Sequence, residues 1–319
     1  MCSTAKEVAS ELLSLIRVYK DGSVERLMGS PAVHASPEDP ETGVLSKDKT
    51  ISENPNISAR IYLPKLTQSS QKFPVLVYFH GGGFCVESAF SLFETKYMTS
   101  LVSEAKVIAI SIEYGLAPEN PIPVIYQDCW TALQWVASHA VSDGGNKEPW
   151  LSTYGDFRRL FLGGDSAGAN IVHNIVMRAG IESLPGDVKI LGAFLTHPYF
   201  WGSRPVGSEV ATDLDKHYAF MIWNFLYPSA PGGIDNPMIN FVGPEAPSLA
   251  QLGCSRLLIS VAELDTLKNR GILYYNTVKE SGWKGEYEMK NDFLIFNNSR
   301  ANPVINGWLF ELCNRSSSK

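Results

Sequence analysis

The segment Gly164–Gly168, which reads Gly-Asp-Ser-Ala-Gly, limits the fold more than any other part of this sequence. The run Arg159–Leu162 directly before it is typical of a buried strand, and Asn170–Val172 directly after it continues as a helix. In the pattern G-x-S-x-G, the serine occupies a sharp turn between a strand and a helix, with its oxygen exposed. The helix dipole also favours a negative charge that develops beside this serine. We therefore predict that Ser166 is a nucleophile on a strand–turn–helix unit.

A glycine run in the segment His80–Phe84, which reads His-Gly-Gly-Gly-Phe, supplies a second part of a catalytic site. It follows the apolar run Val75–Phe79, so it lies at the end of a predicted strand. Glycines let the backbone approach a substrate carbonyl closely and expose its N–H groups. We expect Gly81, Gly82 and Gly83 of this oxyanion loop to contribute to an oxyanion hole. Together with Ser166, the loop predicts nucleophilic attack on a carbonyl.

Apolar runs of strand length alternate with segments of helical periodicity through most of the chain. The predicted strands are Ser58–Leu63, Phe73–Phe79, Val107–Ile112, Arg159–Leu162, Ile190–Leu195, Leu257–Val261 and Glu286–Met289. The predicted helices are Asp128–His139, Ala167–Arg178, Lys268–Ser281 and Val304–Leu312. Such alternation builds a mostly parallel α/β sheet with helices on both faces. We expect a single domain over residues 1–319, with an N-terminal cap arm (1–57) that begins with a helix over Val8–Val18, and a cap insertion (199–247).

A carboxylate that could orient a catalytic base follows the last long apolar strand of the pattern. Asp265 lies just after Leu257–Val261, on a loop downstream of the serine, where a triad acid belongs. The same residue could instead cap the helix predicted over Lys268–Ser281, and the two roles are compatible.

Charge and composition exclude several classes of function. The formal net charge is −6, and no Lys/Arg run is dense enough for a nucleic-acid footprint. No apolar run reaches the roughly 18 residues of a membrane span. Five cysteines are scattered without metal-ligand spacing, which favours reduced thiols. We expect a cytoplasmic protein with no cofactor, no metal, no membrane and no nucleic-acid partner, acting on a small molecule.

The chain resembles plant carboxylesterases of the hormone-sensitive-lipase-like group of α/β-hydrolases, and most closely the branch that contains 2-hydroxyisoflavanone dehydratase. The matching motifs are Ile16–Gly22, His80–Phe84, Leu116–Glu119, Gly164–Asn170, Ala230–Gly233 and Ser281–Trp283. The resemblance implies an α/β-hydrolase fold with a sheet of about eight strands. It also implies Ser166 as nucleophile, Asp265 as triad acid, and the N–H groups of Gly82, Gly83 and Ala167 as the oxyanion hole.

One catalytic residue of that family is absent from this sequence. The family carries its histidine in a Glu/Asp-His-x-Phe segment before the terminal helix, but the corresponding text here is Met289–Asn297, with Asn291 and Asp292 before Phe293. The last histidine of the chain is His217. Gly115 also stands where the family usually has arginine. His80, at a strand end, is expected to shape the oxyanion loop rather than to replace the base.

The absence of the histidine leaves three functions open. Loss of a triad histidine costs on the order of 10⁶ in kcat, and Asp292 is a weak substitute because an ordinary Asp pKa is about 3.9. The first hypothesis is a carboxylic ester hydrolase that acts on a small apolar or aromatic ester through Ser166 and is impaired because the triad histidine is absent. The second is a lyase of plant specialised metabolism, a dehydratase or a cyclase. The third is a non-catalytic small-molecule binder similar to the gibberellin receptors. Five aromatic residues suggest a flat apolar ligand, although core packing explains each of them equally well: Phe200, Trp201, Trp223, Phe225 and Tyr227.

Overall fold

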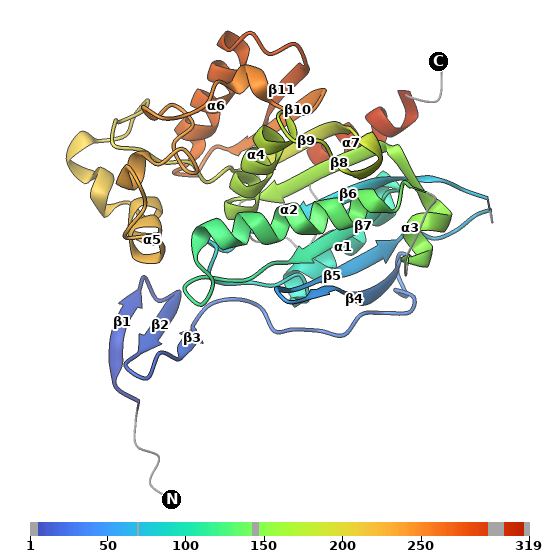
Figure 1. The fold of residues 1–319 in the computed structure, drawn as a ribbon, viewed down its shortest axis with the longest axis horizontal. Helices are drawn as coiled ribbons and strands as arrows, with labels where there is room; N and C mark the ends of the chain where they lie inside the picture. Colours follow the sequence, from blue (N-terminus) through green and yellow to red (C-terminus); the bar gives the residue numbers. More distant parts are fainter. Residues whose placement is uncertain (1–5, 69, 142–146, 293–302, 316–319) are drawn as a thin grey trace, which may run out of the picture.

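The computed structural model describes residues 6–68, 70–141, 147–292 and 303–315. Its centre is an eight-stranded sheet in the order β11-β10-β9-β8-β6-β7-β5-β4 (Figure 1). The strands are β4 (Leu45–Glu53), β5 (Asn56–Leu63), β6 (Phe73–Phe79), β7 (Ile108–Glu113), β8 (Gly155–Asp165), β9 (Ile190–Thr196), β10 (Arg256–Ala262) and β11 (Glu286–Asp292). The six strands from β7 across to β11 are parallel, whereas β4 and β5 pair antiparallel. The expected mostly parallel sheet of about eight strands is therefore confirmed.

Helices cover both faces of the sheet because the central strands, such as β6 and β7, carry apolar residues on both sides. The helices are α1 (Leu92–Ala105), α2 (Ile122–Ser138), α3 (Pro149–Tyr154), α4 (Ala167–Ala179), α5 (Tyr218–Leu226), α6 (Lys268–Glu280) and α7 (Pro303–Arg315). In β6, Val75 and Val77 join the core that α2, α4 and α6 complete, while Leu76 and Tyr78 join the core under α1 and α7. Continuous burial of β6 is typical of a central parallel strand.

The N-terminal arm does not begin with a helix. The helix expected over Val8–Val18 is wrong: the chain forms a small antiparallel sheet of β1 (Val8–Leu12), β2 (Ile16–Tyr19) and β3 (Val24–Arg26). Leu13 and Ser14 both have positive φ, which ends the first strand in a turn. Across that turn, Arg17 and Glu11 form an ion pair at 2.7 Å. The apolar residues that suggested helical spacing fall on the two sides of this turn.

Strand β4 was overlooked in the sequence, where its residues belong to the expected arm. It pairs with β5 at the edge of the main sheet, and half-buried and exposed residues alternate over its residues 47–51. Polar residues such as Lys47 and Lys49 interrupt its apolar pattern, as is usual for edge strands. The insertion expected over 199–247 does break the alternation, since it contains only α5 and two 3₁₀ turns, Ala211–Lys216 and Gly233–Asp235.

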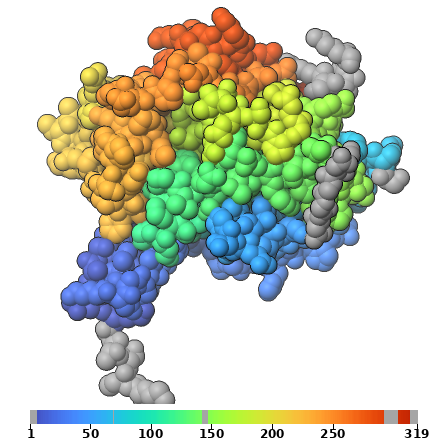
Figure 2. Space-filling model, viewed as in Figure 1, coloured from blue at the N-terminus to red at the C-terminus, as the bar shows by residue number. Residues whose placement is uncertain are grey.

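The N-terminal sheet projects from the main body beside the segment that carries α5 (Figure 2). Strand β1 contacts α5 directly. Arg26 of β3 donates from Nε to the carbonyl oxygen of Cys85 at 2.9 Å and makes a two-pronged ion pair with Glu119. The arm is thereby attached to the residues that follow the oxyanion loop. Among the described residues, no helix is long and apolar enough to cross a bilayer.

Candidate active site

Ser166 lies on the sharp turn that joins β8 to α4. Its backbone has φ 50° and ψ −114°, a strained conformation for a residue other than glycine. Its N–H donates to the carbonyl oxygen of Thr196 at 2.8 Å, and its carbonyl oxygen accepts from the N–H of Tyr199 at 3.1 Å. These bonds fix the turn against the end of β9. The geometry matches the strained nucleophile turn predicted from the sequence.

The two outer glycines of the serine motif are required by close packing. A Cβ on Gly168 would lie 1.9 Å from the carbonyl oxygen of Phe79, and one on Gly164 would lie 2.5 Å from the carbonyl carbon of Gly168. Real Cβ atoms do not approach other atoms this closely. Helix α4 can therefore start directly against the end of β6 only with glycine at both positions, which brings Ser166 next to the oxyanion loop.

The oxyanion loop follows β6 and depends on glycine in the same way. Gly82 has φ +99° and Gly83 has φ +59°, and a Cβ on Gly82 would lie 2.2 Å from the carbonyl oxygen of Val86. In the described part of the chain, the N–H groups of Gly82, Gly83 and Ala167 donate no hydrogen bond to another group of the protein. These three groups fit the donor set that the family resemblance implies.

Gly81 has a different role from its neighbours, because its N–H is already used. It donates to Oδ1 of Asp165 at 2.9 Å, and the hydroxyl of Tyr78 donates to the same oxygen at 2.9 Å. Burial raises the pKa of Asp165, and these hydrogen bonds partly oppose the rise. Asp165, the residue before Ser166, therefore joins the oxyanion loop to the serine turn, and Gly81 supports the loop because its N–H is not free to bind an oxyanion.

His80 is part of the framework of the oxyanion loop. Its ring stacks on Tyr114 with a centroid separation of 4.4 Å. Its Nδ1 lies 2.8 Å from the carbonyl oxygen of Gly81, and the Tyr114 hydroxyl donates to the carbonyl oxygen of His80 at 2.7 Å. Both contacts hold the start of the loop, in agreement with the role expected from the sequence.

Asp265 lies on the loop between β10 and α6, and its side chain is turned inward. The side chain is 9% exposed, and Oδ1 accepts from the N–H of Leu267 at 2.9 Å. Burial raises the pKa of this carboxyl, while the Leu267 N–H and the imidazole of His197 act in the opposite direction. The Asp265 carboxylate therefore bonds to the start of α6 and also faces the interior near β9.

Two histidines approach this loop. Nδ1 of His197 lies 3.8 Å from Oδ2 of Asp265. His217 stacks on Trp201, and its Nε2 contacts the Thr266 hydroxyl at 2.9 Å. The position of His197 was not predicted from the sequence; the available signal was that it directly follows β9, the strand between those that lead to Ser166 and Asp265. Within the described residues, no histidine hydrogen-bonds to the Ser166 hydroxyl.

Asn291 and Asp292, which stand where the family places its histidine, form the end of β11. They pair with Val261 and Ala262 at the end of β10, so they lie on the sheet edge that also carries Asp265. The Asn291 side chain is exposed. The prediction that this segment fills the position of the histidine concerns the Asp292 side chain and residues 293–302, which lie outside the described residues, and it stays a prediction.

Helix α5 covers the oxyanion loop with an apolar side chain. A Cβ placed on Gly83 would lie 3.4 Å from Cδ1 of Ile222, so this isoleucine is in contact range of the loop. Three of the five aromatic residues considered as ligand contacts are core residues, each at most 2% exposed: Phe200, Trp201 and Trp223. Phe200 stacks on Tyr274, for example. Their packing against neighbouring rings accounts for them without a ligand.

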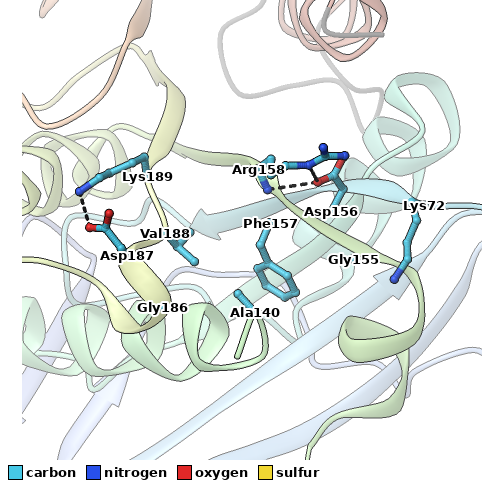
Figure 3. Close-up of a pocket in the computed structure, with 10 residues that line it drawn as sticks. All are labelled: Lys72, Ala140, Gly155, Asp156, Phe157, Arg158, Gly186, Asp187, Val188 and Lys189. Atoms are coloured by element: carbon cyan, nitrogen blue, oxygen red, sulfur yellow. Dashed lines mark hydrogen bonds and ion pairs between the residues drawn. The ribbon is translucent and has the colours of Figure 1, made fainter. Parts of the chain in front are cut away.

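A groove of about 580 Å³ lies at the opposite end of the sheet (Figure 3). Lys72, Gly155 and Lys189 lie at the amino ends of β6, β8 and β9, whereas Ser166 follows the carboxyl end of β8. Its acidic residues Asp156 and Asp187 are paired with neighbouring cations. Ligands of open α/β sheets bind at the carboxyl ends of the strands, so this groove is not the catalytic site.

Comparison with known proteins agrees with this geometry. The chain is 55% identical over 289 residues to 2-hydroxyisoflavanone dehydratase of Glycyrrhiza echinata, covering 90% of this chain and 88% of that protein. It is 42% identical to probable carboxylesterase 13 of Arabidopsis thaliana over 290 residues, 88% of this chain and 87% of the relative. A solved structure of fungal esterases from Rhizomucor miehei superposes with a TM-score of 0.64 at 24% identity, covering 88% of this chain and 85% of that one.

The resemblance to plant carboxylesterases and to the dehydratase branch is thus confirmed. A family model described as alpha/beta hydrolase fold matches residues 76–293, which include the oxyanion loop, the serine turn and the Asp265 loop. The chain belongs to this family of α/β-hydrolases.

Proposed function

We propose that this protein is a lyase that eliminates water from a β-hydroxy ketone of the 2-hydroxyisoflavanone class. The observation that carries the proposal is the combination of a complete oxyanion loop with a chain that has no histidine after His217. Such a site can polarise a carbonyl but lacks the base that efficient acyl transfer requires. The 55% identity to a dehydratase supports the choice of substrate class.

Elimination needs fewer parts than ester hydrolysis. The proton on the carbon next to the carbonyl leaves, and its electron pair passes to the carbonyl oxygen as an enolate. The C–O bond to the hydroxyl on the next carbon then breaks as a C=C bond forms, and the departing hydroxyl takes up the proton that the base removed, so that water leaves. No bond to the enzyme is made. Each oxyanion-hole donor contributes about 10² to 10³ in rate, so this stabilisation survives the loss of the triad histidine.

The roles of the residues follow from this scheme. The N–H groups of Gly82, Gly83 and Ala167 bind the enolate oxygen. Ser166 offers its hydroxyl as a hydrogen-bonding group beside the departing hydroxyl. Asp265 accepts the substrate proton through a water molecule, and the burial that raises its pKa brings the carboxyl closer to an effective base.

The N-terminal sheet and the 199–247 segment act as a cap in this proposal. Arg26 attaches the arm beside the oxyanion loop, and α5 places Ile222 over that loop. An apolar cover excludes water from the enolate and strengthens its hydrogen bonds.

An assay of the purified protein tests the proposal. We expect 2-hydroxyisoflavanone to be converted to the isoflavone, followed by absorbance, faster than in buffer and faster than any p-nitrophenyl ester is hydrolysed. Asp265→Asn should lower the dehydration rate. Dehydration no faster than in buffer would refute the lyase proposal, and tight binding of the ketone without turnover would indicate a binding protein.

Ester hydrolysis is the second candidate, because Ser166 keeps the strained backbone of a nucleophile. The unmodified protein should hydrolyse short p-nitrophenyl esters feebly. Insertion of Glu-His-Val before Phe293 should raise that rate by orders of magnitude. Fast hydrolysis by the unmodified protein, lost in Ser166→Ala, would show instead that another group serves as the base.

A further inference from the structure

His197 follows the strand that separates the strand leading to Ser166 from the strand leading to Asp265. The sheet order places β9 between β8, which leads to Ser166, and β10, which leads to Asp265. His197 directly follows β9 and is 6% exposed. Its Nδ1 lies 3.8 Å from Oδ2 of Asp265, a close ionic contact that is slightly longer than a hydrogen bond. Contacts of catalytic groups are often this long without substrate and shorten when it binds.

Backbone hydrogen bonds join the segment around His197 to β10 on one side and to the serine turn after β8 on the other. The N–H of His197 donates to the carbonyl oxygen of Ser260 in β10 at 2.8 Å. Thr196, just before it, accepts the N–H of Ser166, and Tyr199, two residues after it, donates to the carbonyl oxygen of Ser166. His197 also has φ +48°, a left-handed conformation that a non-glycine residue keeps only where its surroundings impose it. Strain of this kind concentrates at functional sites.

The imidazole of His197 also affects the pKa of two nearby carboxyls. It opposes the rise in the pKa of Asp265 that burial causes, and it acts in the same direction on Asp165. The other nearby histidine, His217, is committed elsewhere, because Nδ1 accepts from the N–H of Ala219 and Nε2 contacts Thr266.

We propose that His197 is a positioning residue that holds the Asp265 carboxylate ready to accept the substrate proton. This inference rests on the proposed function, in which Asp265 is the base. His197 acts on the carboxylate, not on the substrate. In a Ser-His-Asp triad the histidine and the acid are joined by a hydrogen bond, and the His197–Asp265 contact is a pairing of the same two groups.

A double-mutant cycle tests whether His197 acts through Asp265. We expect His197→Ala to lower the kcat of dehydration about tenfold with little change in KM, and His197→Asn, which keeps a polar group beside Asp265, to restore most of the loss. In an Asp265→Ala background, His197→Ala should cost almost nothing further. Equal losses in both backgrounds, or no rescue by asparagine, would overturn the proposal, and so would an Asp265→Ala variant with unchanged kcat.

A second readout separates failure of this inference from failure of the proposed function. The same four variants are unfolded in urea, and the cycle is repeated on the unfolding midpoints. If the native protein shows no dehydration, the proposed function fails. The His197–Asp265 pair is still supported if the midpoint shift of the double variant differs from the sum of the two single-variant shifts, and it is refuted if the shifts add. His139→Ala, which removes a buried histidine at the end of α2, serves as a control that should lower the midpoint without changing kcat.

Discussion

The tie between the serine turn and the oxyanion loop gives a prediction that can be worked out from two hydrogen bonds. In Asp165→Ala, the N–H of Gly81 and the hydroxyl of Tyr78 lose their shared acceptor. Both residues are buried. Leaving a buried donor unsatisfied costs about 1–3 kcal/mol. We therefore expect Asp165→Ala to lower the free energy of unfolding by about 2–4 kcal/mol, the lower part of the two-donor sum, because the loop relaxes partially.

The matched control is Asp165→Asn, which keeps an oxygen at the acceptor position. Burial raises the pKa of Asp165 in the folded protein, so folding favours the protonated carboxyl. The contribution of Asp165 to stability is therefore greatest below its pKa in the unfolded chain, about 3.9. It falls as the pH rises from that value through the higher pKa in the folded protein. The asparagine variant lacks this loss. It should unfold within about 1 kcal/mol of the wild type near neutral pH, and its stability relative to the wild type should improve as the pH rises through that range.

The assay is urea unfolding followed by tryptophan fluorescence at several pH values, together with the dehydration rate. Asp165→Ala should also lose about 10² in rate, since the oxyanion donors are displaced, and Asp165→Asn should keep most of it. The reasoning is refuted if the alanine variant matches the wild type in both measurements. It is equally refuted if asparagine is as damaging as alanine, because then the carboxylate charge, and not the two accepted hydrogen bonds, would hold the loop.

Three further predictions concern other parts of the chain. Burial raises the pKa of Glu94 well above its ordinary value, so the stability of the protein should fall as the pH rises above about 4.3. Glu94→Gln should remove this part of the loss, which is measured as the urea unfolding midpoint from pH 5 to 9. Gly82→Ala should reduce turnover at least a hundredfold, because its Cβ would lie 2.2 Å from the Val86 oxygen, while Gly307→Ala, where a Cβ meets nothing, should leave turnover unchanged. Arg26→Ala should speed proteolytic removal of the N-terminal sheet, yet shift the urea midpoint little, since its ion pair is partly exposed and worth about 1 kcal/mol or less; an unchanged cleavage rate would contradict this attachment.

The central fold and the chemical type of the site could be predicted from the sequence because local signals determine them. The buried run of β6 and the two glycine motifs specify strand ends, tight turns and a helix start within a few residues. The lack of a histidine after His217 is likewise a property of the sequence alone. Local signals were misleading in partly exposed segments. The residues of β1 and β2 predicted a helix, and those of β4 were assigned to the N-terminal arm. In these segments, pairing with another strand determines the structure, and local preference does not.

Which groups meet in the site follows from the folded structure and not from the sequence. The sheet order β10-β9-β8 is not visible in the sequence, yet it brings His197 between Ser166 and Asp265. The contact of Gly81 with Asp165 joins residues from two separate motifs, and it assigns Gly81 to loop support instead of the oxyanion hole. A motif fixes the conformation of its own backbone, whereas the partners of its side chains and N–H groups come from strands that are distant in the chain and adjacent only once the sheet has formed.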